Sequence, residues 1–361
     1  MAAPVNTPLF FEPILKPRAW GGDALRSLGK PLPPGTTPST PIGESWELAD
    51  LPPEIPAGCS VVASGPHAGR TLRSLIESNP REVMGAAPLW PDGRFPLLLK
   101  YLDARENLSV QVHPTAAYAE AHPPARIKSE AWYIIHADPG AVIYAGLLPG
   151  VTRQDVERAI AERTLPELMY KIPAVPGDCH YLPSGLCHAL GAGIFAAEVQ
   201  TPSDTTFRLF DWERTDRELH IEAALACLFG TQTDTKADTA PTLPPTRPPG
   251  LPPTLPPGQV EPVEAARTVT TGLCRTEFFE IERIDADPQA SFEAVTNNAP
   301  LIWMVLDGSI RFTPPGGEAM TARSGQTVLL PAGMTDIPLG FVAATRYLQI
   351  SLPAAHGTLL A

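Results

Sequence analysis

Proline is so frequent along this chain that long helices are excluded from large parts of it. The sequence has 44 prolines among 361 residues, whereas proline usually makes up only about 5 % of the residues of a protein. Many of them gather in two runs, KPLPPGTTPSTP (Lys30–Pro41) and PTLPPTRPPGLPPTLPPGQVEP (Pro241–Pro262). Proline has no backbone N–H and a fixed φ, so such runs form neither helix nor central strand. The second run is typical of a semi-rigid linker between domains.

Between the prolines, most segments are short, apolar or alternating, and they end at glycine, proline or aspartate. This pattern predicts a mostly β protein with a sandwich or barrel architecture. The predicted strands include Leu97–Leu102, Leu108–His113, Glu130–His136, Ala141–Tyr144 and Ile194–Gln200. The predicted helices are Thr71–Met84 with a break at Pro80, Thr152–Tyr170 with Thr152 as N-cap, and Glu218–Phe229.

An internal repeat refines this architecture. GDCHYLPSGLCH (Gly177–His188) and GQTVLLPAGMTD (Gly325–Asp336) share glycine, proline and glycine at the same spacing. The segments before them, AWYIIHADPGAVIY and LIWMVLDGSIRF, also resemble each other. The shared pattern resembles the second sequence motif of the cupin superfamily, in which a Pro-x-Gly turn precedes an inward-pointing ligand. Only the first copy keeps a histidine at that place; the second copy has Asp336.

The repeat therefore predicts a double cupin, two jelly-roll-like β units with a few inserted helices. We expect residues 1–232 to form an N-terminal cupin domain with helical insertions and 233–264 to form the linker. Residues 265–361 are expected to form a degenerate cupin domain without metal ligands. The competing interpretation is two unrelated turns that share a Gly/Pro pattern.

Charge and cysteine content limit the partners. The net charge of −12 argues against nucleic acid as a partner, because an acidic surface repels phosphate backbones. An anionic ligand would need a local cluster of Lys and Arg residues to bind. No secretory signal and no stretch of about 18 apolar residues is evident, so we expect no membrane association. The five cysteines are scattered without a CxxC spacing, which predicts reduced thiols and a cytoplasmic protein. They are Cys59, Cys179, Cys187, Cys227 and Cys274.

Polar residues alternate along SVQVHP (Ser109–Pro114). Residues i and i+2 of a strand share a face, so Ser109, Gln111 and His113 are expected to point the same way. Three inward polar groups need partners, since unpaired buried polar groups are costly. A metal ion and an anion would supply them.

Two further segments add potential metal ligands. Lys128 and Glu130 are again two residues apart before an apolar strand, and His188 follows the Pro-Ser-Gly turn. The candidate set is Gln111, His113, Glu130 and His188. Two imidazoles, a carboxylate and an amide oxygen suit zinc, and also iron, manganese or cobalt.

Six segments spread over nearly two hundred residues resemble the type I mannose-6-phosphate isomerases, in particular their short bacterial form. They are PILKPRAWGG (Pro13–Gly22), GESWELAD (Gly43–Asp50), FPLLLKYLDARENLSVQVHP (Phe95–Pro114), KSEAWYII (Lys128–Ile135), PSGLCHALG (Pro183–Gly191) and EVQTPSDTTFRLFDWER (Glu198–Arg214). The C-terminal third resembles the family only in its general cupin pattern.

The resemblance implies a metal-dependent isomerase that interconverts mannose-6-phosphate and fructose-6-phosphate through an enediol, with 1–232 as the catalytic domain. It implies one zinc ion per chain, with other divalent metals possible, on the four ligands Gln111, His113, Glu130 and His188. It also implies that Arg208 is the active-site arginine, that Lys128 contacts the substrate, and that Ser109 and Lys100 line the same pocket. The base stays open among Glu198, Asp204 and a metal-bound water.

Two other functions fit the same scaffold. A non-haem iron cupin dioxygenase is disfavoured because the Lys, Arg and Ser residues suit a phosphorylated polyol rather than an apolar substrate. A non-catalytic sugar-binding cupin is disfavoured because all four ligands and Arg208 are kept. Another hexose phosphate, such as glucose-6-phosphate, is not excluded as substrate. The oligomeric state is left open between a monomer and a weak dimer.

Overall fold

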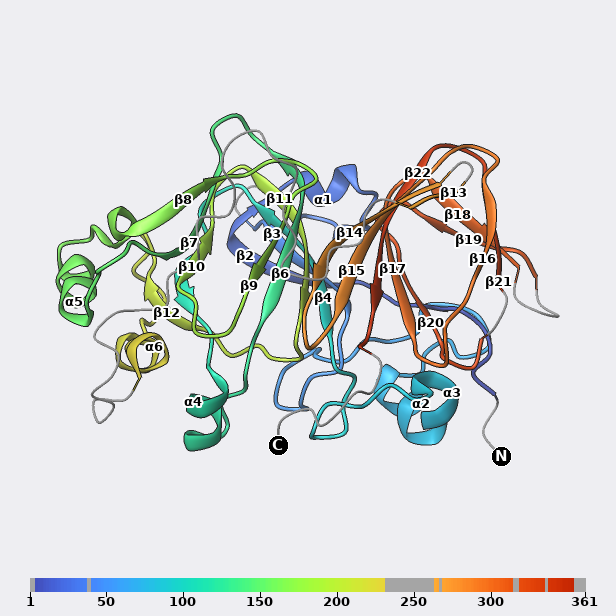
Figure 1. Cartoon of the computed structure of the whole chain (residues 1–361), viewed down its shortest axis with the longest axis horizontal. Helices are drawn as coiled ribbons and strands as arrows, with labels where there is room; N and C mark the ends of the chain where they lie inside the picture. The colour runs from blue at the N-terminus through green and yellow to red at the C-terminus, as the bar shows by residue number, and fades with distance from the viewer. Residues whose placement is uncertain are drawn as a thin grey trace.

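Two β units lie side by side in the computed structural model of the chain (Figure 1). The structure describes residues 4–37, 40–230, 263–265, 268–313, 318–334 and 337–353. The proline run Pro241–Pro262 and Asp336 lie outside the described residues. Each unit consists of two antiparallel sheets, as the mostly β double-cupin prediction requires. The fold prediction is therefore confirmed.

The first unit has a six-stranded and a five-stranded sheet. The six-stranded sheet has the order β2 (Ile14–Gly22), β3 (Ile42–Leu48), β4 (Leu98–Ala104), β11 (Ile194–Gln200), β6 (Glu130–Ala137) and β9 (Cys179–Leu182). The five-stranded sheet has the order β12 (Phe207–Phe210), β5 (Val110–Val112), β10 (His188–Leu190), β7 (Val142–Leu147) and β8 (Met169–Pro173). The five strands predicted from sequence are thus confirmed: both ends of Ile194–Gln200 match, and the ends of the other four differ by at most three residues.

The second unit has a seven-stranded and a four-stranded sheet. The larger sheet has the order β1 (Leu9–Phe10), β20 (Thr327–Leu330), β17 (Leu301–Asp307), β22 (Thr345–Ser351), β15 (Glu280–Ala286), β14 (Thr268–Arg275) and β13 (Val263–Ala265). The smaller sheet has the order β16 (Ser291–Ala294), β21 (Ile337–Phe341), β18 (Ser309–Phe312) and β19 (Met320–Arg323).

The internal repeat has a direct structural counterpart. In the first copy the chain leaves the larger sheet at the end of β9 and enters the smaller sheet at β10. In the second copy it passes in the same way from β20 to β21. The preceding pairs, β6 with β7 and β17 with β18, also change sheet in both units. The shared Gly/Pro spacing therefore marks equivalent crossings between sheets, and not two unrelated turns.

The first strand of the chain belongs to the second unit. Leu9 and Phe10 of β1 pair with Leu329 and Val328 of β20. At the other side of the linker, β13 already pairs with β14 from Val263 onward. The boundaries 1–232, 233–264 and 265–361 stay predictions, because most of the linker lies outside the described residues.

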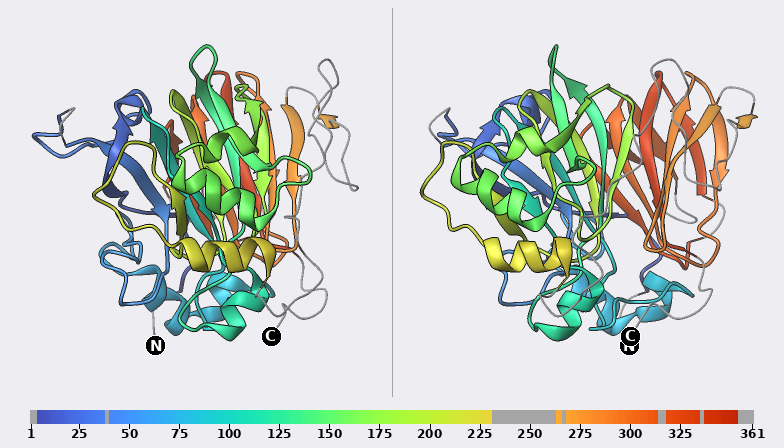
Figure 2. Two further views of the ribbon diagram at one scale, coloured as in Figure 1. Left: turned by 90° about the vertical axis from the view of Figure 1, so that its left-hand side faces the viewer. Right: turned by 60° about the vertical axis from the view of Figure 1, so that its left-hand side comes forward.

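Six α-helices and one 3₁₀ helix are inserted between the described strands. They are α1 (Ala24–Ser27), α2 (Leu72–Ser78), α3 (Pro80–Met84), α4 (Ala116–Ala121), α5 (Arg153–Ala161), α6 (Ile221–Phe229) and the 3₁₀ helix Leu165–Leu168. Helices α5 and α6 cover the outer face of the five-stranded sheet (Figure 2). None of the helices in the described residues is long and apolar enough to span a membrane.

The predicted helices are confirmed in position, and Thr71–Met84 is also confirmed in length, whereas Glu218–Phe229 begins three residues later at Ile221. Pro80 begins α3 directly after the break from α2. Thr152 caps α5 with a capping box: its hydroxyl accepts a hydrogen bond from the Asp155 N–H, and the Asp155 carboxylate accepts one from the Thr152 N–H. The prediction of one helix to Tyr170 was wrong: α5 ends at Ala161. Arg163 adopts a positive φ of 61°, which a helix does not accommodate, and the chain then forms the 3₁₀ helix Leu165–Leu168 before it enters β8.

The six-stranded sheet is covered on both faces. One face meets the five-stranded sheet of its own unit, and the other packs on the second unit, where Leu99 and Tyr101 share a core with Phe279, Ile281 and Met304. Every residue of β3, β4 and β11 is accordingly buried. A strand buried on both sides loses the usual alternation of exposed and buried residues. This sheet therefore carries the candidate site on one face and the junction between the units on the other.

Candidate metal centre and active site

Three potential metal ligands converge between the two sheets of the first unit. His113 directly follows β5, His188 begins β10, and Glu130 begins β6 in the facing sheet. His113 Nε2 lies 3.2 Å from Glu130 Oε2, and His188 Nε2 lies 3.2 Å from Glu130 Oε1. Their ligand atoms all lie within 4.8 Å of one another, and all three residues are fully buried. The sandwich thus brings together residues that are 75 positions apart in sequence.

Strand register explains how the rest of the group is placed. Arg208 of β12, Gln111 of β5 and His188 of β10 are neighbours across three adjacent strands. Gln111 Nε2 lies 3.3 Å from His188 Nε2, and Ser109 Oγ lies 3.5 Å from Gln111 Oε1. Because the two ends of a glutamine amide have the same shape, the oxygen can take the place that faces His188. Gln111 is therefore positioned as a fourth potential ligand.

The buried polar atoms of this group fit a metal ion. Both ring nitrogens of His113 and both carboxylate oxygens of Glu130 form no hydrogen bond of good geometry among the described residues. Fully buried polar atoms without hydrogen bonds are rare, and they call for a partner such as an ion. The His188 Nδ1 lies 2.8 Å from the Leu186 carbonyl, which holds Nδ1 as the protonated nitrogen and leaves the Nε2 lone pair free.

Protonation also favours a cation at this place. Burial and the nearby Lys128 ammonium lower the pKa of His113 to about 3, so its imidazole is neutral and can act as a ligand. Burial opposes ionisation of Glu130, but the Lys128 ammonium together with His113 and His188 outweighs burial and holds the pKa of the carboxyl well below its usual value. Lys128 Nζ lies 2.9 Å from Glu130 Oε2. The group therefore offers the neutral imidazole of His113, the Nε2 of His188 and one carboxylate, a set that divalent transition metals prefer.

A second polar group lies on the six-stranded sheet. Lys100 Nζ is 2.8 Å from Glu198 Oε1 and donates a hydrogen bond of 2.6 Å to Gln200 Oε1. Trp132 Nε1 donates to the other oxygen of Glu198 at 3.0 Å. The indole ring of Trp132 in turn lies 5.5 Å from the ring of His188, between centroids. Trp132 therefore contacts both the Lys100–Glu198 pair and one of the potential metal ligands.

A third polar group, which was not predicted from the sequence, lies on β2 and β3. Arg18 Nε lies 2.7 Å from Glu44 Oε1, and Trp46 Nε1 donates to Glu44 Oε2 at 2.7 Å. Lys16 Nζ lies 4.2 Å from the centroid of the Trp46 ring. Burial opposes ionisation of Glu44, but Lys100 and Arg18 lower the pKa of its carboxyl to about 2. The alternation of Glu44 and Trp46 with Ser45 and Glu47 in GESWE was the available signal for this group.

Arg208 is half-buried at the edge of the five-stranded sheet. Its Nη1 donates to the Glu218 carbonyl at 2.7 Å, and its backbone N–H donates to His220 Nδ1 at 3.3 Å. Its buried Nε has no hydrogen bond among the described residues. Burial and repulsion from Arg217 lower the pKa of the guanidinium. The loop that follows β12 therefore fixes one end of the side chain and leaves other donors free.

The predicted site residues lie in four places in the structure. Ser109 and Lys128 lie with the four potential ligands, and Lys100 lies with Glu198 on the facing sheet. Arg208 lies one strand from Gln111. Asp204 is exposed, and its carboxylate attracts the charges of Lys16, Arg18 and Lys100. The individual roles of these residues stay predictions.

The chain is therefore a double-cupin protein. Two buried histidines and one carboxylate form a candidate metal centre between the sheets of its first unit. The family model for the catalytic domain of type I phosphomannose isomerase matches residues 9–142. Mannose-6-phosphate isomerase ManA of Bacillus subtilis is 41 % identical over 224 residues, which cover 60 % of this chain and 67 % of that protein. The Bacillus subtilis protein YvyI is 31 % identical over 345 residues, with 92 % and 96 % covered.

Solved structures agree with these sequence relatives. The crystal structure of the mannose 6-phosphate isomerase from Bacillus subtilis superposes with a TM-score of 0.77 at 30 % identity, covering 96 % of this chain and all of that one. A structure from Archaeoglobus fulgidus, at 19 % identity and a TM-score of 0.69, shares the fold. The chain belongs to the type I mannose-6-phosphate isomerase family.

Proposed function

We propose that this protein is a metal-dependent aldose–ketose isomerase that interconverts mannose-6-phosphate and fructose-6-phosphate. The observation that carries the proposal is the buried group of His113, Glu130 and His188, which lies beside Lys128. The membership of the chain in this family supports the same conclusion. Sequence relatives of known name act on the same substrate, which supports the same reaction here. A non-catalytic cupin would have no need for so many buried charges in one place.

The reaction moves a proton between C1 and C2 of the sugar. It requires a base that reaches both carbons and positive charge near the oxygen that becomes anionic. A divalent metal on Gln111, His113, Glu130 and His188 would supply Lewis acidity next to the reacting oxygens. The residue that we assign as base is Glu198, whose carboxylate is kept in place by Lys100 and Trp132.

Arg208 is assigned to the developing negative charge. Its guanidinium is held at one end by the Glu218 carbonyl, and its other donors remain available to an oxyanion. An arginine fixed before the reaction needs little reorganisation, which is how preorganised donors lower a barrier. Lys128 lies next to Glu130, and we assign it to contact a sugar hydroxyl.

Positive charge gathers locally in spite of the net charge of −12. Electrostatic interactions link Lys16 to Arg18 and Lys100, and they link Arg208 to Arg18 across the two sheets. The carboxylates of Glu44, Glu198 and Asp204 lie among these cations and offset part of their charge. Such a cluster can attract a phosphate within a Debye length of about 8–10 Å, even when the protein as a whole is acidic. We assign recognition of the substrate phosphate to this cluster, together with Ser109.

The metal we propose is zinc, one ion per chain. The two imidazoles and one carboxylate suit it, as they suit iron, manganese or cobalt, so metal analysis must decide. We also place the enzyme in the cytoplasm, because all five cysteines are free thiols. We propose a monomer or a weak dimer as the functional unit.

A coupled assay of mannose-6-phosphate isomerisation tests the function. The purified chain should convert the substrate, lose activity on chelation and recover it when zinc is added. Glucose-6-phosphate, measured in parallel, defines the sugar preference. Absence of turnover of any hexose-6-phosphate by fully metal-loaded protein would refute the proposal, and oxygen consumption with bound iron would favour a dioxygenase.

A further inference from the structure

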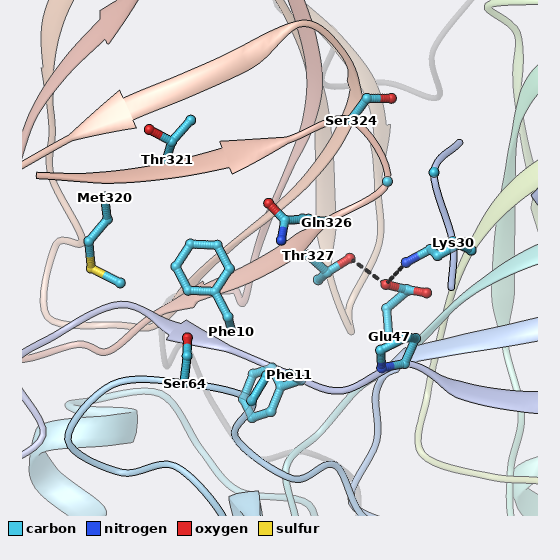
Figure 3. Close-up of a pocket in the computed structure, with 14 residues that line it drawn as sticks. Phe10, Phe11, Lys30, Glu47, Ser64, Met320, Thr321, Ser324, Gln326 and Thr327 are labelled. Atoms are coloured by element: carbon cyan, nitrogen blue, oxygen red, sulfur yellow. Dashed lines mark hydrogen bonds and ion pairs between the residues drawn. The ribbon is translucent and has the colours of Figure 1, made fainter. Parts of the chain in front are cut away.

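A cavity of about 320 Å³ lies at the junction between the two units, apart from the metal group. The first strand of the chain, the segment after α1, β3 and the turn from β19 to β20 all contribute to its lining (Figure 3). Small-molecule sites occupy about 300–1,000 Å³, so this cavity is at the lower end of that range. Its volume equals roughly ten water molecules in the liquid, which is enough for a small organic molecule.

The cavity and the candidate active site lie on opposite faces of β3. Side chains alternate along β3, so Glu44 and Trp46 belong to the active-site group while Ser45 and Glu47 point the other way. Glu47 lines the cavity and contacts Thr327 of the second unit. The same strand therefore carries two polar sites on its two faces.

The floor of the cavity is a buried and neutralised ion pair. Lys30 and Glu47 are 8 % and 4 % exposed, and Lys30 Nζ lies 2.5 Å from Glu47 Oε2. Thr327 donates to the same oxygen at 3.3 Å, and Ser45 donates to Oε1 at 2.6 Å. An ammonium has three N–H donors, and within the described part of the chain this bond to Glu47 is its one hydrogen bond. Lys30 thus keeps donor capacity for a ligand oxygen.

The walls and mouth combine aromatic and polar groups. Phe10 and Phe11 line one side, and Ser64 lies near them (Figure 3). Opposite, the Gln326 amide nitrogen points into the cavity, while its oxygen accepts a hydrogen bond from the Arg323 N–H at 2.8 Å. Gln326 and Ser64 line the cavity and are exposed, so both lie on its solvent-facing side.

We propose that this cavity binds a small neutral polyol, an unphosphorylated sugar or sugar alcohol. The Lys30–Glu47 pair carries no net charge, so the site has no excess charge with which to hold an ion. A phosphate placed against this floor would meet the Glu47 carboxylate, whereas hydroxyl groups can both donate and accept. The phenyl rings offer apolar surface to the C–H groups of the ligand, as in other small-molecule sites. The proposal does not depend on the isomerase activity.

Binding of mannitol to the full-length protein tests the proposal. Mannitol cannot be isomerised and carries no phosphate, so isothermal titration reports on the cavity rather than on turnover. Native protein and Ser64→Ala should bind mannitol equally well, and Ser64→Trp, which blocks the mouth, should bind at least tenfold more weakly. Gln326→Ala should weaken binding severalfold. Because Ser64 and Gln326 are exposed, unchanged melting temperatures are expected and verify folding.

Two further measurements distinguish binding in the cavity from binding at the active site. Chelated Arg208→Ala protein should bind mannitol as tightly as native protein does, and inorganic phosphate should not compete. A crystal structure with mannitol should show the molecule against Thr327 and Lys30. Undetectable binding by native protein, equal binding by Ser64→Trp, or loss of binding in chelated Arg208→Ala would each overturn the proposal. None of these outcomes depends on whether mannose-6-phosphate is turned over.

Discussion

Lys100 and Glu198 are directly paired across β4 and β11, and Lys100 Nζ lies 2.8 Å from Glu198 Oε1. Both residues are at least 96 % buried by area. Burial favours the neutral form of Lys100, but Glu198 and Glu44 outweigh it and raise the pKa of the ammonium. The pairing therefore keeps Lys100 charged inside the first cupin, and it fixes the orientation of the carboxylate that we assign as base.

Glu198→Gln should lower kcat by about 10²- to 10⁴-fold, the usual effect of removing a general base. The amide keeps the size of the side chain and can still accept from Trp132, so KM and metal content should change little. Steady-state kinetics and metal analysis check this. Glu282→Gln, in the second unit, is the matched control and should keep full activity. An unchanged kcat in Glu198→Gln would indicate that the base is Asp204 or a metal-bound water instead.

A double variant separates catalysis from stability at the same pair. Glu198→Gln leaves the buried Lys100 without its nearest carboxylate, which should cost on the order of 3 kcal/mol of unfolding free energy. Adding Lys100→Met removes the unpaired charge and should recover part of that stability without recovering kcat. Chemical denaturation and kinetics on the same samples measure both quantities. Recovery of activity in the double variant would contradict a catalytic role for Glu198.

Arg208→Ala should lower kcat by about 10²- to 10³-fold, because a preorganised donor to the anionic intermediate is lost. Arg208→Lys should recover only part of this, since a point charge cannot both bind the Glu218 carbonyl and reach the substrate. Arg346→Lys, at a half-exposed pair with Asp285 in the second unit, is the control. Equal kcat values for Arg208→Lys and native protein would show that charge alone suffices.

Metal binding should stabilise the fold independently of catalysis. Because the unpaired atoms of His113 and Glu130 gain a partner, added zinc should raise the melting temperature of the chelated protein. A ligand at one hundred times its Kd adds about 2.7 kcal/mol to the free energy of unfolding. Glu130→Gln should show a much smaller rise and less than one metal per chain by mass spectrometry. An identical zinc response in that variant would exclude Glu130 as a ligand.

Acid should destabilise the protein partly through Glu44. Its folded-state pKa of about 2 lies below the ordinary value of 4.5, so its contribution is present above pH 4.5 and is lost as the pH falls towards 2. A shift of this size corresponds to roughly 3 kcal/mol. Unfolding free energies of Glu44→Gln should therefore depend less on pH between about 5 and 3 than those of native protein. Parallel pH profiles for the two proteins would contradict this role.

Helix α5 should contribute to stability and not to catalysis. Thr152→Ala removes the capping box at its first turn and should cost about 1 kcal/mol of unfolding free energy. The helix lies on the outer face of the five-stranded sheet, so kcat and KM should stay at native values. Denaturation and kinetic measurements check both expectations. Altered kinetics would indicate that the helix reaches the active site.

The sequence alone determined the repeat and the local order of potential ligands. Period-2 alternation placed Ser109, Gln111 and His113 on one face, and the Pro-Ser-Gly turn placed His188 at the start of a strand. The double-cupin architecture followed because both copies of the Gly/Pro pattern encode the same crossing between sheets. Such local signals are readable because turn chemistry and strand alternation depend on neighbouring residues.

Tertiary structure alone decided which distant residues meet. The Arg18–Glu44–Trp46 group depends on the pairing of β2, β3 and β4, and pairing is a non-local choice that a residue pattern does not specify. Packing of the second unit on the six-stranded sheet placed Glu47 against Thr327, which are 280 residues apart. The helix end at Ala161 was also set by context, since propensity is weak next to tertiary packing. Contacts across such separations form because the fold buries both partners together.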